Sequence, residues 1–375
     1  MSSNLALQCW FLTGATATGK SAVGIELARR IGAEIVSLDS MALYRGMDIG
    51  TAKPSAAARQ SVPHHLIDVL DPDEEYSLAQ YVEAAGRCAA EIAGRGREVL
   101  FVGGTPLYLK GLLRGIFQGP PADWELRRRL SDQTRLKGSR WLHEQVALID
   151  PAAAARLHPN DTRRLIRAWE VYEKTGRPIS EWQRQFDIGR AAAECRVFAL
   201  DWPRAELCAR IGQRVAEMFA AGLVEEVRRL CSPGPLSGHR PKVGRERARV
   251  RAVDEPNSDG PHPLPLSQRE RGDGLGSSQR ERGDALGSAL SRTARQAVGY
   301  REVIEHLEGR RSLTETIELV EQHTRQLAKR QGTWFRSLSE CRFLPVSDPL
   351  VAEELAERIV REAGPPPLTP CGGGV

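Results

Sequence analysis

A glycine-rich stretch near the amino terminus, TGATATGKS at 13–21, constrains the fold more than any other part of this sequence. An apolar run at 9–12 precedes it, so strand, loop and helix follow one another in the order that a phosphate-binding loop needs. In such a loop, backbone N–H groups and a helix N-terminus face an anion. The stretch fits the pattern G-x-x-x-x-G-K-[ST], with Gly14, Gly19, Lys20 and Ser21 at its fixed places.

This loop predicts a bound diphosphate or triphosphate but does not identify the compound that carries it. Lys20 supplies a positive charge, and the Ser21 hydroxyl can reach a metal ion. The chain contains only seven lysines, so a chance match that places one directly after a required glycine is improbable. A glycine turn without a ligand is the alternative.

Alternating strand and helix patterns around the loop predict an α/β fold, a P-loop NTPase-like parallel sheet flanked by helices. Ligands of such sheets gather at the carboxyl ends of the strands, where we expect the loop, Asp39 and Thr105 to lie together. The predicted segments after the loop are a helix at 21–32, a strand at 33–39, a helix at 76–96, a strand at 98–105 and a strand at 195–202.

Arginine-rich helical patterns interrupt this core and predict a helical insertion domain. Its second helix carries Leu165 and Trp169 on one apolar face, with Asp161 as the cap at the start and Gly176 at the end. The predicted division is a P-loop core at 1–118, a helical insertion at 119–190, the continued core at 191–232, a low-complexity insertion at 233–288, core helices at 289–345, and a C-terminal helix with a flexible tail at 346–375.

The low-complexity segment at 233–288 contains a tandem copy, SQRERGDGLGS followed by SQRERGDALGS. It is rich in Pro, Gly, Ser and Arg and poor in apolar residues, so it cannot bury enough surface to offset the entropy of ordering. We therefore predict a disordered surface loop. A nucleic-acid-binding arm and an acquired insertion without a role are both open, and the second is favoured.

Composition excludes several classes of protein. No run of 18 or more apolar residues is present, and the first residues lack the pattern of a signal peptide, so we expect a cytoplasmic protein without a membrane span. Seven scattered cysteines without a C-x-x-C pair indicate neither a zinc site nor a disulfide framework. The net charge of +5 matters for binding only if the arginines gather on one face.

Asp39 is the only acid placed close behind a core strand near the loop. A nucleotide hydrolase of this fold normally carries a further acidic strand end for Mg²⁺ and water, but the third strand here ends in FVGGT. A carboxylate at 39 can help hold a metal ion, or accept a proton from a nucleophile that attacks a group anchored by the loop. It can also cap a helix together with Ser40.

Several blocks resemble, in order, those of the tRNA dimethylallyltransferases. They are GATATGKS, LDSMALYRGMDIGTAKP, PHHLIDVLDP, YSLAQY, VGGTPLYLKGLLRG, HPNDTRRLIRAWEVYEKTGRP, QAVGYREV and TRQLAKRQGTWFR. The resemblance runs from about residue 8 to 345. It implies that dimethylallyl diphosphate and the anticodon stem-loop of a tRNA are the partners, and that the exocyclic amine of the adenosine 3′-adjacent to the anticodon takes the prenyl group while diphosphate leaves. We expect a monomer that uses Mg²⁺.

The resemblance also implies roles for individual residues. The catalytic ones are Asp39 as the base that accepts the proton, Lys20 at the leaving diphosphate and Thr105 at the reaction centre. Diphosphate is bound by Gly14, Ala15, Thr16, Ala17, Thr18, Gly19, Lys20 and Ser21, and Ser21 also holds the metal. The tRNA contacts are Asp39, Ser40, Met41, Ala42, Thr105, Arg127, Arg163, Arg164, Leu165, Ile166, Arg167, Gln296, Ala297, Val298, Gly299, Tyr300 and Arg301, with the arginines on phosphates and Tyr300 stacked on a base.

Each of these roles has a plainer alternative on the residues alone. Thr105 can cap a helix, Tyr300 can pack in the core, and the arginines can form a solvated helix face. Two other functions also remain open. A P-loop kinase for a small metabolite would use the same loop for ATP, and a non-catalytic RNA-binding protein would use it to sense a nucleotide.

Overall fold

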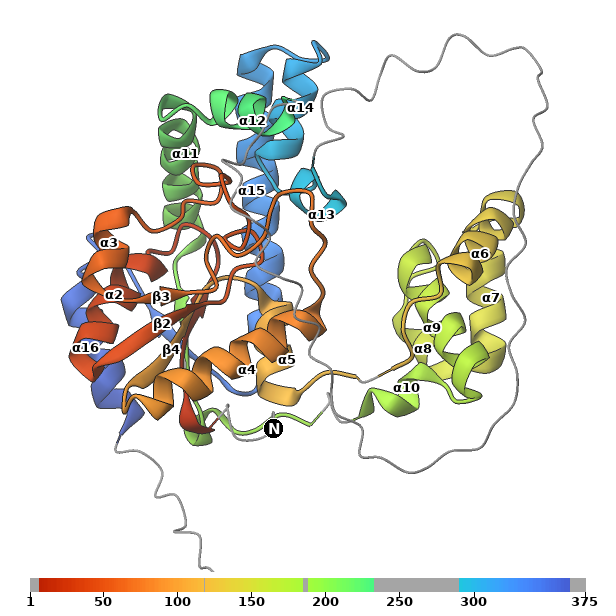
Figure 1. Ribbon diagram of the computed structural model, residues 1–375, viewed down its shortest axis with the longest axis horizontal. Helices are drawn as coiled ribbons and strands as arrows, with labels where there is room; N and C mark the ends of the chain where they lie inside the picture. The colour runs from red at the N-terminus through yellow and green to blue at the C-terminus, as the bar shows by residue number, and fades with distance from the viewer. Residues whose placement is uncertain (1–6, 118, 185–187, 233–289, 365–375) are drawn as a thin grey trace, which may run out of the picture.

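The computed structural model describes residues 7–117, 119–184, 188–232 and 290–364. Its centre is a sheet of six strands, all of them parallel, in the order β3-β2-β4-β1-β5-β6 (Figure 1). The predicted parallel α/β sheet is therefore confirmed. The strands are β1 Trp10–Gly14, β2 Ala33–Ser37, β3 His64–His65, β4 Glu98–Val102, β5 Arg196–Asp201 and β6 Cys341–Pro345.

Helices cover both faces of the sheet because the strands are apolar on both faces. In β1, Trp10 and Leu12 join the apolar cluster that includes α2 (Lys20–Ile31) and α16 (Ala352–Ala363). Phe11 points to the other face and stacks on Phe101 of β4, with ring centroids 4.9 Å apart. This second face is covered by α4 (Leu78–Gly94) and α5 (Pro106–Arg114), so the sheet lies between the two helix pairs in Figure 1.

Most of the remaining core helices lie toward the carboxyl ends of the strands, whereas the short η2 directly precedes β5 and lies at its amino end. The longest, α15 (Leu313–Arg336), begins with a capping box in which Ser312 and Glu315 satisfy each other's backbone N–H groups. It packs beside α11 (Arg204–Ala220), and a small apolar cluster of both helices also holds Ala15 of the glycine-rich loop. The others are α3 Ala56–Ser61, η2 Ala192–Glu194, α12 Leu223–Cys231, α13 Arg292–Arg295 and α14 Tyr300–Leu307.

Five further helices share an apolar cluster of their own and form a bundle beside the sheet in Figure 1. Leu165 is buried in this cluster and Trp169 packs at its edge, as the predicted apolar face requires. The Asp161 side chain accepts a hydrogen bond from the Arg164 N–H, and the helix ends at Gly176 with a φ of 66°, so both predicted ends are confirmed. The five helices are α6 Trp124–Lys137, α7 Ser139–Ile149, α8 Pro151–Arg156, α9 Thr162–Thr175 and α10 Ile179–Trp182.

Some of the predicted secondary-structure elements differ from those in the structure. The strand predicted at 33–39 ends at Ser37, which leaves Asp39 two residues beyond the carboxyl end. Strands β3 and β6 were not predicted. The disordered loop predicted at 233–288 and the end of the predicted tail lie outside the described residues. Among the helices that the structure describes, none is both long and apolar enough to cross a membrane.

Candidate active site

A cavity of about 430 Å³ opens at the carboxyl ends of β1, β2 and β4. It brings together the glycine-rich loop, Asp39 and Thr105, as the sequence predicted. The lining also includes residues from α11, α15 and the turn before α14, which are distant in the chain. The residues that matter below are Thr16, Ala17, Thr18, Gly19, Lys20, Ser21, Asp39, Ser40, Met41, Ala42, Gly50, Thr51, Lys53, Gly104, Thr105, Arg214, Gln296, Ala297, Val298, Tyr300, Arg330 and Gln331.

The glycine-rich loop has the backbone that an anion site needs. Gly19 directly precedes α2 with a φ of 83°, so the helix starts at Lys20 with its free N–H groups toward the cavity. Gly14 has a φ of 142°, and a Cβ there would lie 2.8 Å from the carbonyl oxygen of Leu200, so only glycine fits. Trp202 also fixes the loop, because its Nε1 donates a hydrogen bond to the Thr18 carbonyl oxygen (3.1 Å).

Two half-buried cations, Lys20 and Arg214, make this side of the cavity electropositive. Burial and the charge of Arg214 lower the pKa of Lys20 to about 7, although Asp39 acts in the opposite direction. Burial likewise lowers the pKa of Arg214, and its Nε has no hydrogen-bond partner among the described residues. Lys20 Nζ donates to the Ala15 carbonyl within the loop. A bound anion would relieve the repulsion between these two cations, so the site favours a multiply charged ligand.

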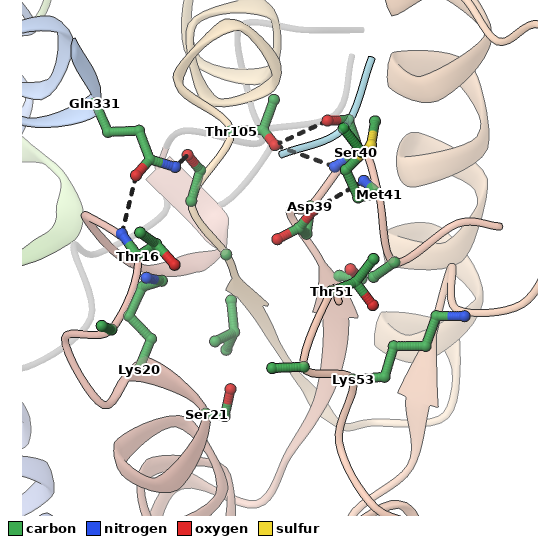
Figure 2. A pocket seen from close by; sticks show the side chains of 18 of the residues that line it. Thr16, Lys20, Ser21, Asp39, Ser40, Met41, Thr51, Lys53, Thr105 and Gln331 are labelled. Carbon is green, nitrogen blue, oxygen red and sulfur yellow. Dashed lines mark hydrogen bonds between the residues drawn. The ribbon is translucent and has the colours of Figure 1, made fainter. Parts of the chain in front are cut away.

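Gln331 of α15 links the loop to the turn that follows the neighbouring strand β4. Its Oε1 accepts a hydrogen bond from the Thr16 N–H (2.9 Å), and its Nε2 donates to the Gly104 carbonyl (2.6 Å; Figure 2). The side chain therefore sets the spacing between the loop and the turn that leads from β4 into α5. The sequence placed Gln331 in a block of the resemblance but gave no signal for this bridge.

Asp39 and Thr105 lie on the other side of the loop. Asp39 Oδ1 accepts from the Met41 N–H (2.8 Å), and Figure 2 shows the other carboxylate oxygen facing the cavity on the side of Lys20. The capping alternative for Asp39 is wrong, because no helix begins at this turn. Thr105 precedes α5 but makes no capping bond. Its Oγ1 accepts from the Ser40 N–H (3.0 Å) and so holds the Asp39 turn in place.

The turn before α14 reaches the cavity, but the role predicted for Tyr300, stacking on a base, is wrong. Gln296, Ala297 and Val298 line the cavity, as a contact with the acceptor requires. Tyr300 is fully buried and its hydroxyl donates to Glu226 (2.6 Å), so its ring cannot stack on a base. Gly299 precedes α14 with a φ of 96°, and Arg301 is outside the cavity beside Glu305 (3.4 Å).

The predicted tRNA contacts of the helical bundle lie on α6 and α9, and none of them lines this cavity. Arg163 and Arg164 are exposed, whereas Leu165 and Ile166 are buried in the bundle. The predicted contacts of these last two side chains with RNA are therefore wrong. The guanidinium groups of Arg127 and Arg167 both pair with the buried carboxylate of Glu170.

The metal prediction rests on a sparse set of donors. The structure, in the parts it describes, has no group of three or more His, Cys, Asp or Glu that could hold a metal ion. Ser21 and Asp39 line the same cavity and offer oxygen donors. Such a pair suits Mg²⁺, which keeps water and takes further ligands from substrate phosphates rather than from a protein cage.

Comparisons with known proteins identify the family. The chain matches the IPP transferase family over residues 42–250 and 278–338, and the isopentenyl transferase family over 7–69. A tRNA dimethylallyltransferase of Geobacter metallireducens is 42% identical over 87% of this chain and 89% of its own length. The chain belongs to the tRNA dimethylallyltransferase family. A second family member, from Rhodopirellula baltica, is 41% identical over 89% of this chain and 86% of its own length.

Solved structures agree with this assignment. The full-length tRNA isopentenylpyrophosphate transferase of Bacillus halodurans is 30% identical, with a TM-score of 0.58 over 95% of this chain and 97% of its own. A eukaryotic dimethylallyltransferase acting on tRNA has a TM-score of 0.62 over 91% of this chain and 74% of its own, but at 23% identity it supports the fold alone. The resemblance in the sequence blocks is confirmed, and these relatives favour a prenyl transferase over a kinase.

Proposed function

We propose that this family member transfers the dimethylallyl group of dimethylallyl diphosphate to the exocyclic amine of the adenosine 3′-adjacent to the anticodon of a tRNA. The observation that carries the proposal is one cavity with two unlike sides. One side has the glycine-rich loop with Lys20 and Arg214, and the other has the carboxylate of Asp39. An anion-binding side and a proton-accepting side are what alkyl transfer from a diphosphate needs.

The cationic side stabilises the leaving group. As the bond from the allylic carbon to oxygen breaks, negative charge grows on the diphosphate and positive charge grows on the carbon. The loop N–H groups and Lys20 are held in place before the reaction and stabilise this anion with little rearrangement, and Arg214 adds a second positive charge. Ser21 would help to hold Mg²⁺, which would add positive charge beside the leaving diphosphate.

The other side prepares the amine. The lone pair of the exocyclic amine is delocalised into the adenine ring, so the nitrogen attacks well only if a base removes its proton as the C–N bond forms. Asp39 is that base in this proposal. Its turn is fixed by the hydrogen bonds from Met41 N–H to Asp39 and from Ser40 N–H to Thr105, which limits the reorientation that the carboxylate needs.

The acceptor base must leave the stack of its loop to reach this cavity. Turning a nucleotide out costs a few kcal/mol, which contacts elsewhere on the RNA must offset. The exposed Arg163 and Arg164 of α9 suit backbone phosphates, and Gln296 at the cavity suits the acceptor loop. We expect the enzyme to act in the cytoplasm, where tRNA is matured.

A single assay tests the proposal. Purified protein is mixed with Mg²⁺, labelled dimethylallyl diphosphate and unmodified tRNA, without ATP. We expect label in the RNA at the adenosine 3′ of the anticodon, and release of diphosphate in equal amount. Label that never enters RNA, or a strict need for ATP with phosphate transfer to a small molecule, would refute the proposal in favour of a kinase.

A further inference from the structure

One wall of the cavity is a turn that is held from outside the site. We define the distal wall as residues 48–54, of which Gly50 to Pro54 line the cavity. In Figure 2, Asp39 lies between Lys20 on one side and Thr51 of the distal wall on the other. The distal wall therefore faces the acceptor half of the site, across Asp39 from the cationic half.

A buried carboxylate from α12 holds this wall. Glu226 is only 2% exposed, and its Oε2 accepts hydrogen bonds from the N–H groups of Asp48 (3.0 Å) and Ile49 (2.8 Å). Its Oε1 accepts from the Gly50 N–H at 3.3 Å. A carboxylate that collects consecutive backbone N–H groups fixes the path of the backbone, because bonds to a charged acceptor are stronger than neutral ones.

Tyr300 of α14 completes the arrangement. Its hydroxyl donates to Glu226 Oε1 (2.6 Å), and its ring lies directly against Gly50. A Cβ on Gly50 would be 2.5 Å from ring carbon Cε2, so the wall approaches the ring as closely as glycine permits. Burial and the nearby charge of Glu226 raise the pKa of Tyr300, so the hydroxyl keeps the proton that it donates.

Lys53 is a second anchor of the distal wall. The side chain of Lys53 is only 1% exposed, and its Nζ pairs with Asp48 (2.8 Å) and Asp68 (2.6 Å). The pair with Asp48 holds the turn together, and the pair with Asp68, which lies outside the distal wall, anchors the turn at Lys53. The bonds to Glu226 anchor residues 48–50, so their loss leaves the turn formed but frees these three residues to shift.

We propose that Glu226 and Tyr300 are positioning residues that fix the distal wall for the accepting nucleobase, and not for the diphosphate substrate. The inference rests on the proposed function. All four of the hydrogen bonds that Glu226 accepts come from Tyr300 or residues 48–50. Thr51, which directly follows these residues, lies across Asp39 from Lys20 of the glycine-rich loop in Figure 2. A planar base held between Asp39 and a displaced wall would present its amine at the wrong distance for proton transfer and attack.

The test compares three variants of the full-length protein. Glu226→Gln keeps the size but removes the charge, and its amide nitrogen would oppose one of the donors that the carboxylate satisfies. Tyr300→Phe keeps the ring against Gly50 and removes only the hydroxyl. Glu225→Gln is the matched control, because Glu225 lies on the same helix, 64% exposed, beside Arg228.

Steady-state kinetics with each substrate varied in turn give the decisive readout. For Glu226→Gln we expect kcat/KM for tRNA to fall about tenfold or more, with KM for dimethylallyl diphosphate within about twofold of the wild type. For Tyr300→Phe we expect kcat/KM for tRNA to fall about threefold, again with KM for dimethylallyl diphosphate nearly unchanged. For Glu225→Gln we expect no change in either value. Hydrogen exchange should speed up at residues 48–50 in Glu226→Gln but not at 14–21.

Several results would overturn the inference. If kcat/KM falls equally for tRNA and for dimethylallyl diphosphate, Glu226 has only a general structural role. If the kinetics are unchanged in both Glu226→Gln and Tyr300→Phe, these two residues do not position the wall for the acceptor. If Glu226→Gln does not fold, the milder Tyr300→Phe decides by the same asymmetry. A wild-type protein that transfers no prenyl group refutes the proposed function instead, whereas an active wild type with symmetric losses refutes only the positioning role.

Discussion

Glu170 offers a test of what holds the helical bundle together. Its carboxylate is fully buried and accepts hydrogen bonds from the Asp123 N–H (2.7 Å) and from Arg127 Nε (2.9 Å) and Nη2 (2.7 Å). It also pairs with Arg167. One side chain of α9 thus fixes the start of α6 and neutralises two arginines. We expect Glu170→Ala to destabilise the bundle far more than any substitution of an exposed glutamate.

The size of the effect follows from the burial of the partners. Removing one member of a buried ion pair costs about 3–5 kcal/mol. The side chains of Arg127 and Arg167 are 29% and 27% exposed, so they can recover some hydration, and the lower end, about 3 kcal/mol, applies. The bundle has its own apolar cluster, so we expect it to unfold as a unit. For roughly 60 residues this lowers Tm by about 12 °C or more.

Thermal unfolding followed by tryptophan fluorescence measures this change. The control is Glu144→Ala on α7 of the same bundle, because Glu144 is 61% exposed and its pair with Arg140 contributes at most about 1 kcal/mol. If Glu170→Ala lowers Tm no further than Glu144→Ala does, the buried carboxylate is not what holds the bundle. The fluorescence reports mainly on this bundle, which contains four of the seven tryptophans, Trp124, Trp141, Trp169 and Trp182.

Acid should weaken the same contact. Burial raises the pKa of Glu170, but the hydrogen bonds from Arg127, the Asp123 N–H and Arg167 outweigh it, so the pKa lies below the ordinary value of 4.5. A lowered carboxylate pKa contributes stability that is present above the ordinary pKa and is lost as pH falls through the folded-state value. The Tm difference between wild type and Glu170→Ala should therefore shrink below about pH 4.

Three further predictions concern the site. Asp39→Asn should lower the rate of prenyl transfer about 10²–10⁴-fold while calorimetry still detects binding of dimethylallyl diphosphate; a rate within about threefold of wild type would exclude Asp39 as the base. The pKa of Lys20 is about 7, so its amine loses its positive charge as pH rises above about 7. We therefore expect kcat/KM for the diphosphate substrate to fall over the same range. A flat profile from pH 6 to 9, or the same decline in Lys20→Arg, would contradict this assignment. Arg164→Ala should weaken tRNA binding and reduce the slope of log affinity against log salt by about one, and an unchanged slope would remove Arg164 from the phosphate contacts.

The sequence predicted the parts of the site that follow from local pattern. The loop at 14–21 could be placed together with Asp39 and Thr105, which follow β2 and β4, because parallel strands bring their carboxyl ends to one edge of a sheet. The caps of α9 at Asp161 and Gly176 could likewise be predicted from the sequence, because capping depends on residues within one turn of the helix end.

Other parts depend on packing between distant segments and left no local pattern. Arg214 and Gln331 enter the cavity from α11 and α15, whose position over the loop is set by the apolar cluster around Ala15. Tyr300 was predicted to stack on a base of the RNA. An aromatic residue near a binding segment has no sequence pattern that distinguishes stacking on a ligand from burial in the core. Its partner Glu226 comes from another helix, and only the fold shows that they meet.

The strand pairing has a consequence for how the chain folds as it is synthesised. β1 leaves the ribosome before the other five strands of this sheet, yet it pairs on one side with β4 and on the other with β5, where Phe11 meets Val197. One edge of β1 therefore stays open until the whole helical bundle has been translated. During that interval the bundle can fold through its local contacts, whereas the nascent sheet exposes an apolar edge that chaperones would need to shield.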